Sequence, residues 1–305
     1  MTFDQIKYFM AVVEYGNFSK AAEYLYISQS SLSKQIKSLE DELKNRLFIR
    51  NGIRIELTSA GQLFLEFAKD TIDAYRDFLN QASYNGGHCT LRVGTLPLLL
   101  EYSFMDIISH FQMQYEHVLL SLIEDTQSGL MKMLDNRLID AAIARSDFLS
   151  PKNYRIVPSH QDVLCVVCSR NHHLAEKEEL SLGDLMNESM ILLGEDSSIY
   201  RLIREACLQY GFKPNIVFTS NRHTHLLGMI QQESEMISIL PNKMIEHNLD
   251  SGIAIIEMKE KIYTTTSLIL DKRNNENPYL NEFSNWWRTK AAYKSFEDIV
   301  ERITV

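Results

Sequence analysis

The chain has 305 residues, 45% of them hydrophobic, which suits two or three domains with packed cores and excludes a single small domain. Its formal net charge is −9, but residues 1–58 hold 8 basic and 7 acidic side chains, so this segment carries +1 and the remainder −10. An acidic surface repels nucleic acid, so the charge distribution favours nucleic-acid contact through the amino-terminal segment alone.

The amino-terminal segment is predicted to form helices joined by tight turns. Residues 4–15 have one apolar face, which indicates a supporting helix; its members are Ile6, Phe9, Met10 and Val13. Gly16-Asn17 predicts a turn, and a second helix is expected from Ser19. After a break at Tyr26-Ile27 the helical spacing of apolar residues resumes at Leu32, Ile36, Leu39 and Leu43.

The helix expected after this break has an outward face suited to a DNA duplex. Ser28 lies at its start, where the hydroxyl can accept a backbone N–H of the first turn as an N-cap. From Ser28 to Leu39 there are two lysines and no carboxylate. Side chains suited to base edges in a major groove are Gln29, Ser30, Ser33 and Lys34. The residues expected to hold phosphates are Ser28, Ser31 and Lys37.

A β-hairpin is predicted next in the chain. Asn51-Gly52 lies between short apolar flanks, and both residues tolerate positive φ, so the pair indicates a hairpin turn. Between Leu43 and Ile55 the basic residues occur without a carboxylate. We expect this hairpin to be the wing of a winged helix-turn-helix, with Arg50 and Arg54 near the phosphates.

These elements resemble the amino-terminal domain of LysR-type transcriptional regulators. Three motifs carry the resemblance in order, namely FSKAAEYLYISQSSLSKQIKSLEDEL, RLFIR and LTSAG. The chain departs from the family pattern at Lys44, where a glycine commonly ends the recognition helix, and at Ser30, where a proline is common. Asn45 can take the left-handed conformation in place of the glycine.

A long helix is predicted from Thr58, its cap, to about Ala82. It has two adjacent apolar stripes, one of Leu63, Phe67, Thr71, Ala74 and Phe78, the other of Phe64, Ala68, Ile72, Tyr75 and Leu79. This is too much apolar surface for a solitary linker, so we expect the helix to pair with its copy in a second subunit. The resemblance implies the same dimer interface. The alternative is that this helix packs on the domain of its own chain. Residues 84–88 read as a flexible hinge.

From Leu91 onward the pattern alternates between strands and helices. The expected strands are 91–95, 119–124, 140–144, 155–158, 163–169, 189–193, 216–219, 237–240 and 263–270. The expected helices are 98–114, 129–136, 198–210, 224–233 and 278 to about 295. Such alternation predicts parallel sheets covered by helices.

This part of the chain resembles the periplasmic-binding-protein-like effector domain of the same family. The resemblance implies an α/β domain of two subdomains, with crossings near His160–Asp162 and Lys259–Tyr263. The expected division is a winged helix-turn-helix domain at 1–58, a dimerisation helix and hinge at 59–88, and an effector domain at 89–305. Its first subdomain is expected at about 89–160 and 264–305, and its second at about 161–263.

The resemblance also implies an effector cleft at the carboxyl ends of strands, where helix amino-termini favour anions. The residues expected to line it are Thr95, Leu96, Leu98, Gln127, Ser128, Arg145, Ser146, Ser197, Ser198, Ser220 and Asn221. Members that bind anionic effectors often have hydroxyl residues after the first strand, whereas this chain has Leu96-Pro97-Leu98-Leu99-Leu100. We therefore expect a partly apolar effector, or one held chiefly from the second subdomain.

Several reactive residues have simpler interpretations. Cys165 and Cys168 lie three apart within an apparent buried strand, which sends their side chains to opposite faces, so core packing is favoured over a redox or zinc motif. Cys207 has no second cysteine shortly after it and is expected to be structural. The pairs His172-His173 and His223/His225 have no cysteine or carboxylate near in sequence to complete a metal site, so solvated turns are expected.

No cofactor, metal or catalytic centre is predicted. The chain contains no Gly-x-Ser-x-Gly nucleophile elbow and no phosphate-binding glycine loop. The cysteines occur without a secretory signal, and there is no uninterrupted apolar run of about 18 residues. A cytoplasmic location without membrane contact is therefore expected.

The sequence is thus identified as a member of the LysR-type family, a sequence-specific DNA-binding transcriptional regulator controlled by a small-molecule effector. Its expected partners are double-stranded DNA, the effector, further copies of itself as a dimer or homotetramer, and RNA polymerase. The alternatives are a cytoplasmic solute-binding or sensor protein that acts through protein contacts, and an unrecognised hydrolase.

Overall fold

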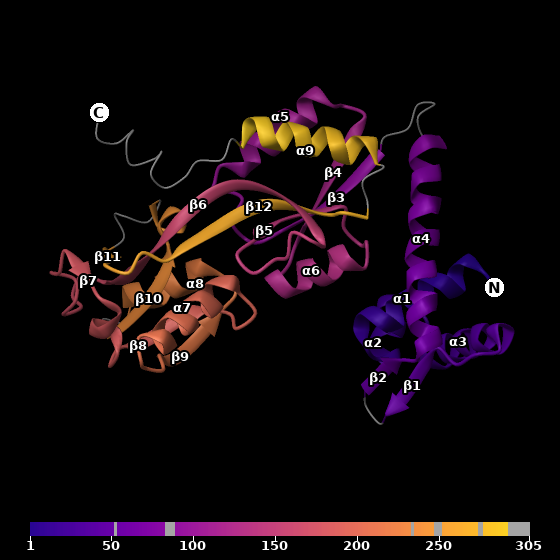
Figure 1. Ribbon diagram of the computed structural model, residues 1–305, viewed down its shortest axis with the longest axis horizontal. Helices are drawn as coiled ribbons and strands as arrows, with labels where there is room; N and C mark the ends of the chain where they lie inside the picture. The colour runs from indigo at the N-terminus through magenta and orange to yellow at the C-terminus, as the bar shows by residue number, and fades with distance from the viewer. Residues whose placement is uncertain (52–53, 83–88, 233–234, 247–251, 274–276, 292–305) are drawn as a thin grey trace. The chain divides into compact units, whose positions relative to one another are not determined.

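The computed structural model describes residues 1–51, 54–82, 89–232, 235–246, 252–273 and 277–291. The chain divides into two compact units, residues 1–85 and 86–305, and each is described by itself (Figure 1). The predicted hinge at 84–88, Gly52 and the end of the last predicted helix lie outside the described residues.

The first unit is a three-helix core followed by a hairpin and a long helix. Its elements are α1 (Phe3–Tyr15), α2 (Phe18–Tyr24), α3 (Gln29–Leu43), β1 (Phe48–Asn51), β2 (Arg54–Leu57) and α4 (Ser59–Ala82). The antiparallel pair β1–β2 aligns Asn51 with Arg54, as the hairpin prediction requires. The helix faces predicted to be apolar form one core, with Phe9, Leu32 and Ile36 almost fully buried.

Two of the predicted helix caps are confirmed by their hydrogen bonds. The Ser28 hydroxyl accepts the Ser31 N–H at 3.2 Å, and the Thr58 hydroxyl accepts the Gly61 N–H at 2.9 Å. Gly61 is required because a Cβ there would lie 2.1 Å from the Leu47 carbonyl oxygen. The start of α4 is thereby held close against the chain that enters the hairpin.

The end of α3 differs from the prediction. Lys44 itself is left-handed, with φ 53°, so the assignment of that conformation to Asn45 is wrong. The Asn45 N–H donates to the Glu40 carbonyl and the Lys44 N–H to the Asp41 carbonyl. In this hydrogen-bond pattern the left-handed residue is the first one after the helix, and here that residue is Lys44. The Glu40 carboxylate then accepts the N–H groups of Leu47 and Phe48, which fixes the return of the chain.

In its described residues, the second unit is built on one mixed sheet of ten strands. The strands are β3 (Cys89–Thr95), β4 (Val118–Glu124), β5 (Ala141–Arg145), β6 (Tyr154–Ser169), β7 (Glu179–Leu180), β8 (Ser189–Leu193), β9 (Asn215–Ser220), β10 (Met236–Pro241), β11 (Ile253–Met258) and β12 (Tyr263–Asp271). The path is β4-β3-β5-β12-β6-β10-β8-β9, and β11 pairs with β6 and β7. Edge strands β4 and β9 are therefore at opposite ends.

Two long strands join the two lobes of this unit. Figure 1 shows β6 and β12 running side by side from the lobe with β3, β4 and β5 toward the lobe with β8, β9 and β10. The first half of β6 pairs with β12, and its residues 164–169 pair with β10 and β11. We call the part built on β3–β5 the first lobe and the part built on β7–β11 the second lobe.

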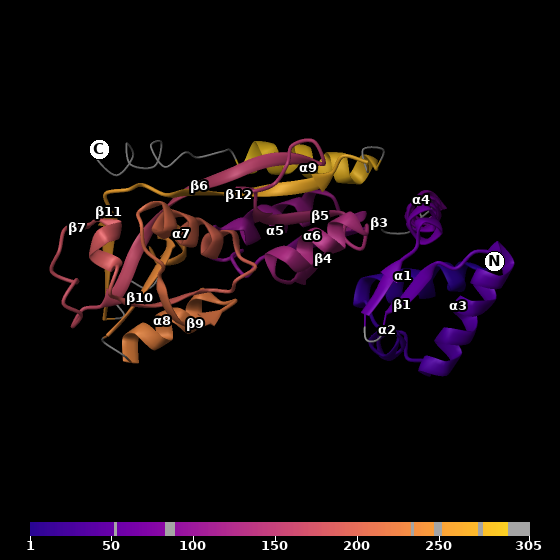
Figure 2. The same ribbon diagram turned by 60° about the horizontal axis from the view of Figure 1, so that its bottom comes forward.

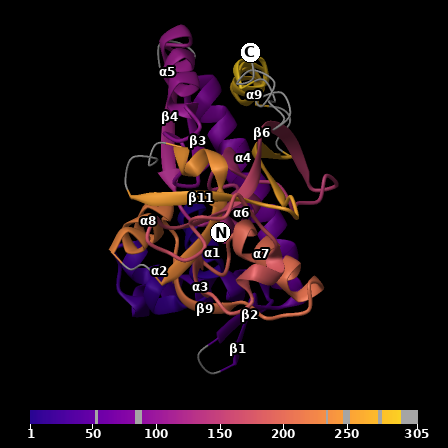
Figure 3. The ribbon, with the colours of Figure 1, turned by 90° about the vertical axis from the view of Figure 1, so that its left-hand side faces the viewer.

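Helices cover both faces of the sheet in each lobe. The helices are α5 (Phe104–Gln114), α6 (Gln127–Asp135), α7 (Ser198–Gln209), α8 (His223–Gln232) and α9 (Pro278–Lys290), with short 3₁₀ turns at Leu182–Leu185 and Asn242–Met244. Alternate residues of β5 face opposite sides of the sheet and belong to different cores. Ile143 packs in the core under α5 and α9, and Ala142 packs in the core under α6. Figure 2 shows α9 beside β6 and β12, and Figure 3 shows α7 and α8 on opposite sides of the second lobe.

The predicted two-subdomain α/β fold class is confirmed, with four local corrections. Segments 155–158 and 163–169 are one strand, β6, and β7 and β11 were missed. Helix α5 begins at Phe104 and not at Leu98, because the chain turns there through left-handed Ser103. A purely parallel sheet is wrong, since β12 is antiparallel to β5 and β6.

Candidate functional site

The outward face of α3 is largely exposed. The buried residues Leu32, Ile36 and Leu39 fix the orientation of the helix on the core. On the opposite side the exposed members of the predicted set are Ser28, Gln29, Ser30, Ser31, Lys34 and Lys37, while Ser33 is half-buried. The side chains of Arg50 and Arg54 lie outside those that the structure describes, although their backbones form the hairpin strands.

A cavity of about 220 Å³ lies between the two lobes of the second unit. We call it the inner cavity. Its lining combines residues at or just after the ends of β3, β4 and β5 with residues at or just after the ends of β8 and β9. From the predicted effector set the structure brings together Leu96, Leu98, Gln127, Arg145, Ser197 and Asn221. Apolar surface comes from Leu96, Pro97, Leu98, Leu193, Ile199 and Met244.

Five residues predicted to line the cleft do not border this cavity. Ser198 is buried, and Thr95 is buried with its hydroxyl donating to the Leu96 carbonyl at 2.7 Å. The Ser128 hydroxyl donates to Asp196 across the cleft at 2.9 Å. The Ser146 hydroxyl lies 2.8 Å from that of Ser267, and the Ser220 hydroxyl lies 2.9 Å from His225 Nδ1. The hydroxyls of Thr95, Ser128, Ser146 and Ser220 are therefore engaged within the protein.

Sequence reasoning missed several polar residues of the inner cavity. They are Glu124, Asp125, Thr126, Asp196 and Arg222. Glu124 ends β4 and Arg222 follows β9, so the position of each at a strand end was a usable signal. An ion pair joins Glu124 to Arg222 across the two lobes. A Cβ at Gly194 would lie 2.1 Å from Asn221 Oδ1, so a larger residue there would displace the Asn221 side chain.

The charge of Arg145 is balanced inside the first lobe. Arg145 is only 3% exposed, and its Nη1 lies 3.6 Å from the Asp162 carboxylate. Its Nη2 donates to the Tyr102 hydroxyl at 2.6 Å, and that hydroxyl donates in turn to Asp162. Burial raises the pKa of Tyr102, so the phenol stays protonated. Burial would also raise the pKa of Asp162, but the hydrogen bond from His160 and the Arg145 charge outweigh it and hold that pKa low.

The inner cavity is consequently poor in free positive charge. Glu124, Asp125 and Asp196 border it beside the two arginines, Arg145 and Arg222. Arg145 is paired with Asp162, and Arg222 is paired with Glu124. A ligand with apolar surface and hydrogen-bonding groups fits this lining better than a compact polyanion does.

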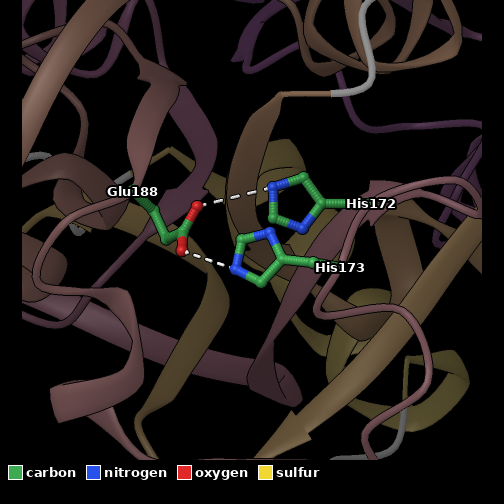
Figure 4. A group of neighbouring side chains, drawn as sticks. All are labelled: His172, His173 and Glu188. Atoms are coloured by element: carbon green, nitrogen blue, oxygen red, sulfur yellow. Dashed lines mark ion pairs between the residues drawn. The ribbon is translucent and has the colours of Figure 1, made fainter.

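A second polar cluster lies in the second lobe, away from the cavity. Figure 4 shows His172 and His173 directed at the Glu188 carboxylate, with N···O distances of 3.4 and 3.1 Å. His172 is buried, as is His223, so the prediction of solvated histidines is wrong for both. The Leu174 N–H donates to His172 Nδ1 at 3.1 Å, so in the neutral ring Nε2 carries the proton and faces Glu188. Because a metal ligand needs an unprotonated nitrogen, this bonding pattern favours a hydrogen-bonded group over coordination.

The four cysteines are free and buried. Burial raises the pKa of Cys165 to about 12 and the pKa values of Cys168 and Cys207 to about 11. Thiols with such pKa values are protonated near neutral pH and are poor nucleophiles. The expectation of core packing agrees with this burial. Within the described residues, no helix is both long and apolar enough to cross a membrane.

Comparison with known proteins identifies both units. Residues 3–62 match the family described as bacterial regulatory helix-turn-helix protein, lysR family, and residues 85–292 match the LysR substrate binding domain. The chain belongs to the LysR family of transcriptional regulators.

Relatives that match this chain along nearly its full length are also transcriptional regulators. The transcriptional dual regulator GltC of Bacillus subtilis (strain 168) is 27% identical, with 93% of this chain and 95% of GltC covered. The regulator AlsR of the same organism is 25% identical, with coverage of 95% and 98%.

Solved structures show the same fold. A full-length variant of OxyR from Pseudomonas aeruginosa superposes with a TM-score of 0.63 at 20% identity, covering 94% of this chain and 95% of that one. CbnR, a LysR family transcriptional regulator, gives 0.62 at 24% identity, with coverage of 95% and 99%. Full-length CbnR with its target DNA gives 0.60 at 24% identity, with coverage of 96% and 100%.

As a LysR-type regulator, this protein binds DNA sequence-specifically through its helix-turn-helix and is controlled by a small-molecule effector bound between two α/β subdomains. The family is one of regulators and not of enzymes. The match of residues 3–62 decides against a sensor that acts only through protein contacts, and against a hydrolase.

Proposed function

We propose that α3 reads its operator with Gln29, Ser30, Ser33 and Lys34, while Ser28, Ser31, Lys37, Arg50 and Arg54 hold the phosphates. The observation that carries this proposal is the outward, carboxylate-free face of α3 between Ser28 and Leu39. Phosphate contacts fix the register of the helix on the duplex, and base contacts supply the sequence preference.

The protein acts as a dimer formed through α4. Along this helix Leu63 is 77%, Phe67 45% and Phe78 63% exposed. A matching helix from a second copy would bury this apolar stripe and hold two recognition helices about one duplex turn, roughly 34 Å, apart.

A further contact would join two dimers into a tetramer. Both edge strands of the second unit carry exposed apolar side chains, Leu119 and Leu122 on β4, and Val217 and Phe218 on β9. Such edges are surfaces for a partner strand or helix.

The effector is a partly apolar small molecule held in the inner cavity. Its binding changes the angle between the lobes, the spacing of the dimers and the bend of the DNA, and so the access of RNA polymerase. The extent of the shift is limited by the difference in effector affinity between the two conformations. The protein acts in the cytoplasm, with functional divisions at 1–58, 59–88 and 89–305, the first subdomain at about 89–160 and 264–305 and the second at about 161–263.

A mobility-shift assay against fragments flanking the protein's own gene tests the DNA-binding surface. The double variant Lys34→Ala/Lys37→Ala should lose binding to all fragments, because it removes the base contact of Lys34 and the phosphate contact of Lys37. The loss of two positive charges should also make the salt dependence shallower. Lys7→Ala, an exposed lysine on α1 that pairs with Asp4, is the matched control and should bind as the parent does. Equal binding by the double variant and the control would contradict the assigned surface.

A calorimetric panel tests the effector class. Aromatic or branched carboxylates and amides should include binders, whereas small, fully polar anions should bind at least tenfold more weakly because they leave the apolar lining exposed. A panel in which only small polar anions bind would contradict the proposal.

A further inference from the structure

An open groove lies on the first-lobe side of the second unit, apart from the inner cavity. It measures about 710 Å³, and its lining has no residue in common with that of the inner cavity. Strand β6 contributes the run from Arg155 to Pro158, and helix α9 contributes Ser284, Asn285 and Arg288. Figure 2 shows these two elements side by side. We call this feature the lateral groove.

Two arginines of the lateral groove have no acidic partner. In the part of the chain that the structure describes, neither Arg155 nor Arg288 forms an ion pair. Arg155 Nη1 donates to Asn281 Oδ1 at 3.2 Å. Arg288 Nη2 donates to Asn285 Oδ1 at 3.4 Å, so both partners are uncharged amides of α9. Five other arginines of the second unit each lie against a carboxylate, namely Arg92, Arg145, Arg201, Arg222 and Arg273.

The two guanidinium groups lie against the same face of α9. Asn281, Asn285 and Arg288 follow one another at spacings of four and three residues, which places them on one side of the helix. The bond to Asn281 holds the Arg155 guanidinium against that side. Burial lowers the pKa of Arg155, and repulsion by the Arg288 charge lowers it further. Because a guanidinium stays charged near neutral pH, an anion bound at both groups would relieve this repulsion.

The acidic residue of the lining does not neutralise these charges. Among the described residues of the groove, Asp147 alone is acidic. Its carboxylate accepts the Thr264 hydroxyl at 2.8 Å and the Thr265 N–H at 2.7 Å, so both oxygens are engaged with β12. The lining therefore holds two positive charges against at most one negative charge.

The chemistry of the groove matches a phosphate monoester. A phosphate group carries close to two negative charges near neutral pH and has three acceptor oxygens. The planar fork of an arginine donates paired N–H groups to such oxygens. Next to Arg155, the side chains of Ile156, Val157 and Pro158 offer apolar contact to the rest of a ligand.

We propose that the lateral groove is an anion site, in which Arg155 and Arg288 hold the phosphate of a small phosphate monoester with an apolar body. This site is separate from the inner cavity, so it goes beyond the effector function proposed above and does not depend on it.

Three probes test the ligand class by calorimetry on the full-length protein at pH 8. Phenyl phosphate is a dianion with an apolar ring, methyl phenyl phosphate has the same ring with one charge, and inorganic phosphate has no ring. We expect phenyl phosphate to bind about tenfold more tightly than either, because the diester loses a charge and inorganic phosphate loses the apolar contact. Equal affinity for phenyl phosphate and methyl phenyl phosphate would overturn the proposal.

Variants of the two arginines locate the binding event. Arg155→Gln and Arg288→Gln should each weaken phenyl phosphate binding at least tenfold. Arg288→Lys should recover part of this loss, since an ammonium keeps the charge but not the planar fork. Arg204→Gln replaces an exposed arginine of α7 outside the groove, so it is the matched control and should bind as the parent does.

Arg288→Gln keeps the test decisive even where Arg155→Gln does not fold. Arg288 is exposed, and its hydrogen bond within the described residues goes to the neighbouring Asn285, so its loss leaves the core intact. Unchanged affinity for phenyl phosphate in Arg288→Gln would overturn the assignment.

Asn221→Trp distinguishes the lateral groove from the inner cavity, because Asn221 borders only the inner cavity. Phenyl phosphate binding should persist in this variant. Its loss would place the ligand in the inner cavity and contradict the proposed site.

Discussion

Single backbone and hydroxyl groups decide where α3 begins and ends. The Ser28 hydroxyl caps its first turn, and Lys44 takes the left-handed conformation at its end. A side chain with a Cβ is strained in that conformation, which explains why a glycine commonly stands there in the family.

Lys44→Gly should therefore stabilise the first unit by about 1 kcal/mol, because it removes the strain of a left-handed lysine. Urea unfolding checks this as a higher midpoint. Lys37→Gly, in the middle of the same helix, is the opposite control and should cost roughly 0.5–1 kcal/mol. A lower midpoint for Lys44→Gly would show that the lysine side chain makes a contact worth more than the strain.

Base reading also belongs to the residue scale. Gln29→Ala should relax the preference at one operator position by about 1–3 kcal/mol while leaving non-specific affinity unchanged. Selection from a randomised operator library measures this. Gln35→Ala is the control, because that side chain is engaged with Gln5 on the other side of the helix. An unchanged preference in Gln29→Ala would count against its role.

At the scale of elements, α4 has two faces with different neighbours. Phe64, Leu65 and Ala68 are buried in the core of the first unit, whereas Leu63 and Phe67 project outward. The alternative that this helix packs on its own domain thus holds for one stripe. The other stripe has no cover within the described first unit beyond local ring contacts such as Phe64–Phe67.

Leu63→Glu/Phe67→Glu should convert the proposed dimer to a monomer and abolish operator binding, since like charges would face each other across the pair. Sedimentation velocity checks the mass. Gln62→Glu/Glu66→Gln, on a neighbouring exposed face, keeps the charge and should remain dimeric. A double glutamate variant that stays dimeric would place the interface elsewhere.

At the scale of the whole molecule, the second unit depends on strands that serve both lobes. β6 and β12 cross between them, and the Arg145–Asp162 pair joins β5 to the middle of β6 next to the inner cavity. A charge at this depth requires its partner, because an unpaired buried guanidinium is strongly unfavourable.

Asp162→Asn should therefore destabilise the second unit by about 3–5 kcal/mol near neutral pH. The pKa of Asp162 is lower folded than unfolded, so its stabilisation is complete above the ordinary value of about 3.9 and is lost as pH falls through the folded pKa. The stability gap between parent and variant should narrow at acid pH in urea titrations. Arg145→Met/Asp162→Asn should be less destabilised than Asp162→Asn, and a larger loss would contradict this account.

Local patterns were sufficient to predict much of the first unit and most strands of the second. The caps at Ser28 and Thr58, the hairpin and strand β8 follow from neighbouring residues alone. The delayed start of helix α5 did not follow from local patterns. Leu98–Leu100 have helix-forming side chains, and only the left-handed turn at Ser103 prevents a helix from beginning there. Strand β11 was missed since its pairing partners, β6 and β7, are distant in sequence.

The sequence by itself determined the family, the fold class and the outward face of α3, because these depend on ordered motifs and on periodicity within single elements. Only the tertiary structure decided which polar groups meet in the cleft. Glu124 and Arg222 are 98 residues apart, and His223 meets Glu101 across the same gap between lobes. Charges so far apart in the chain are brought together by strand order and lobe packing, which no local pattern encodes.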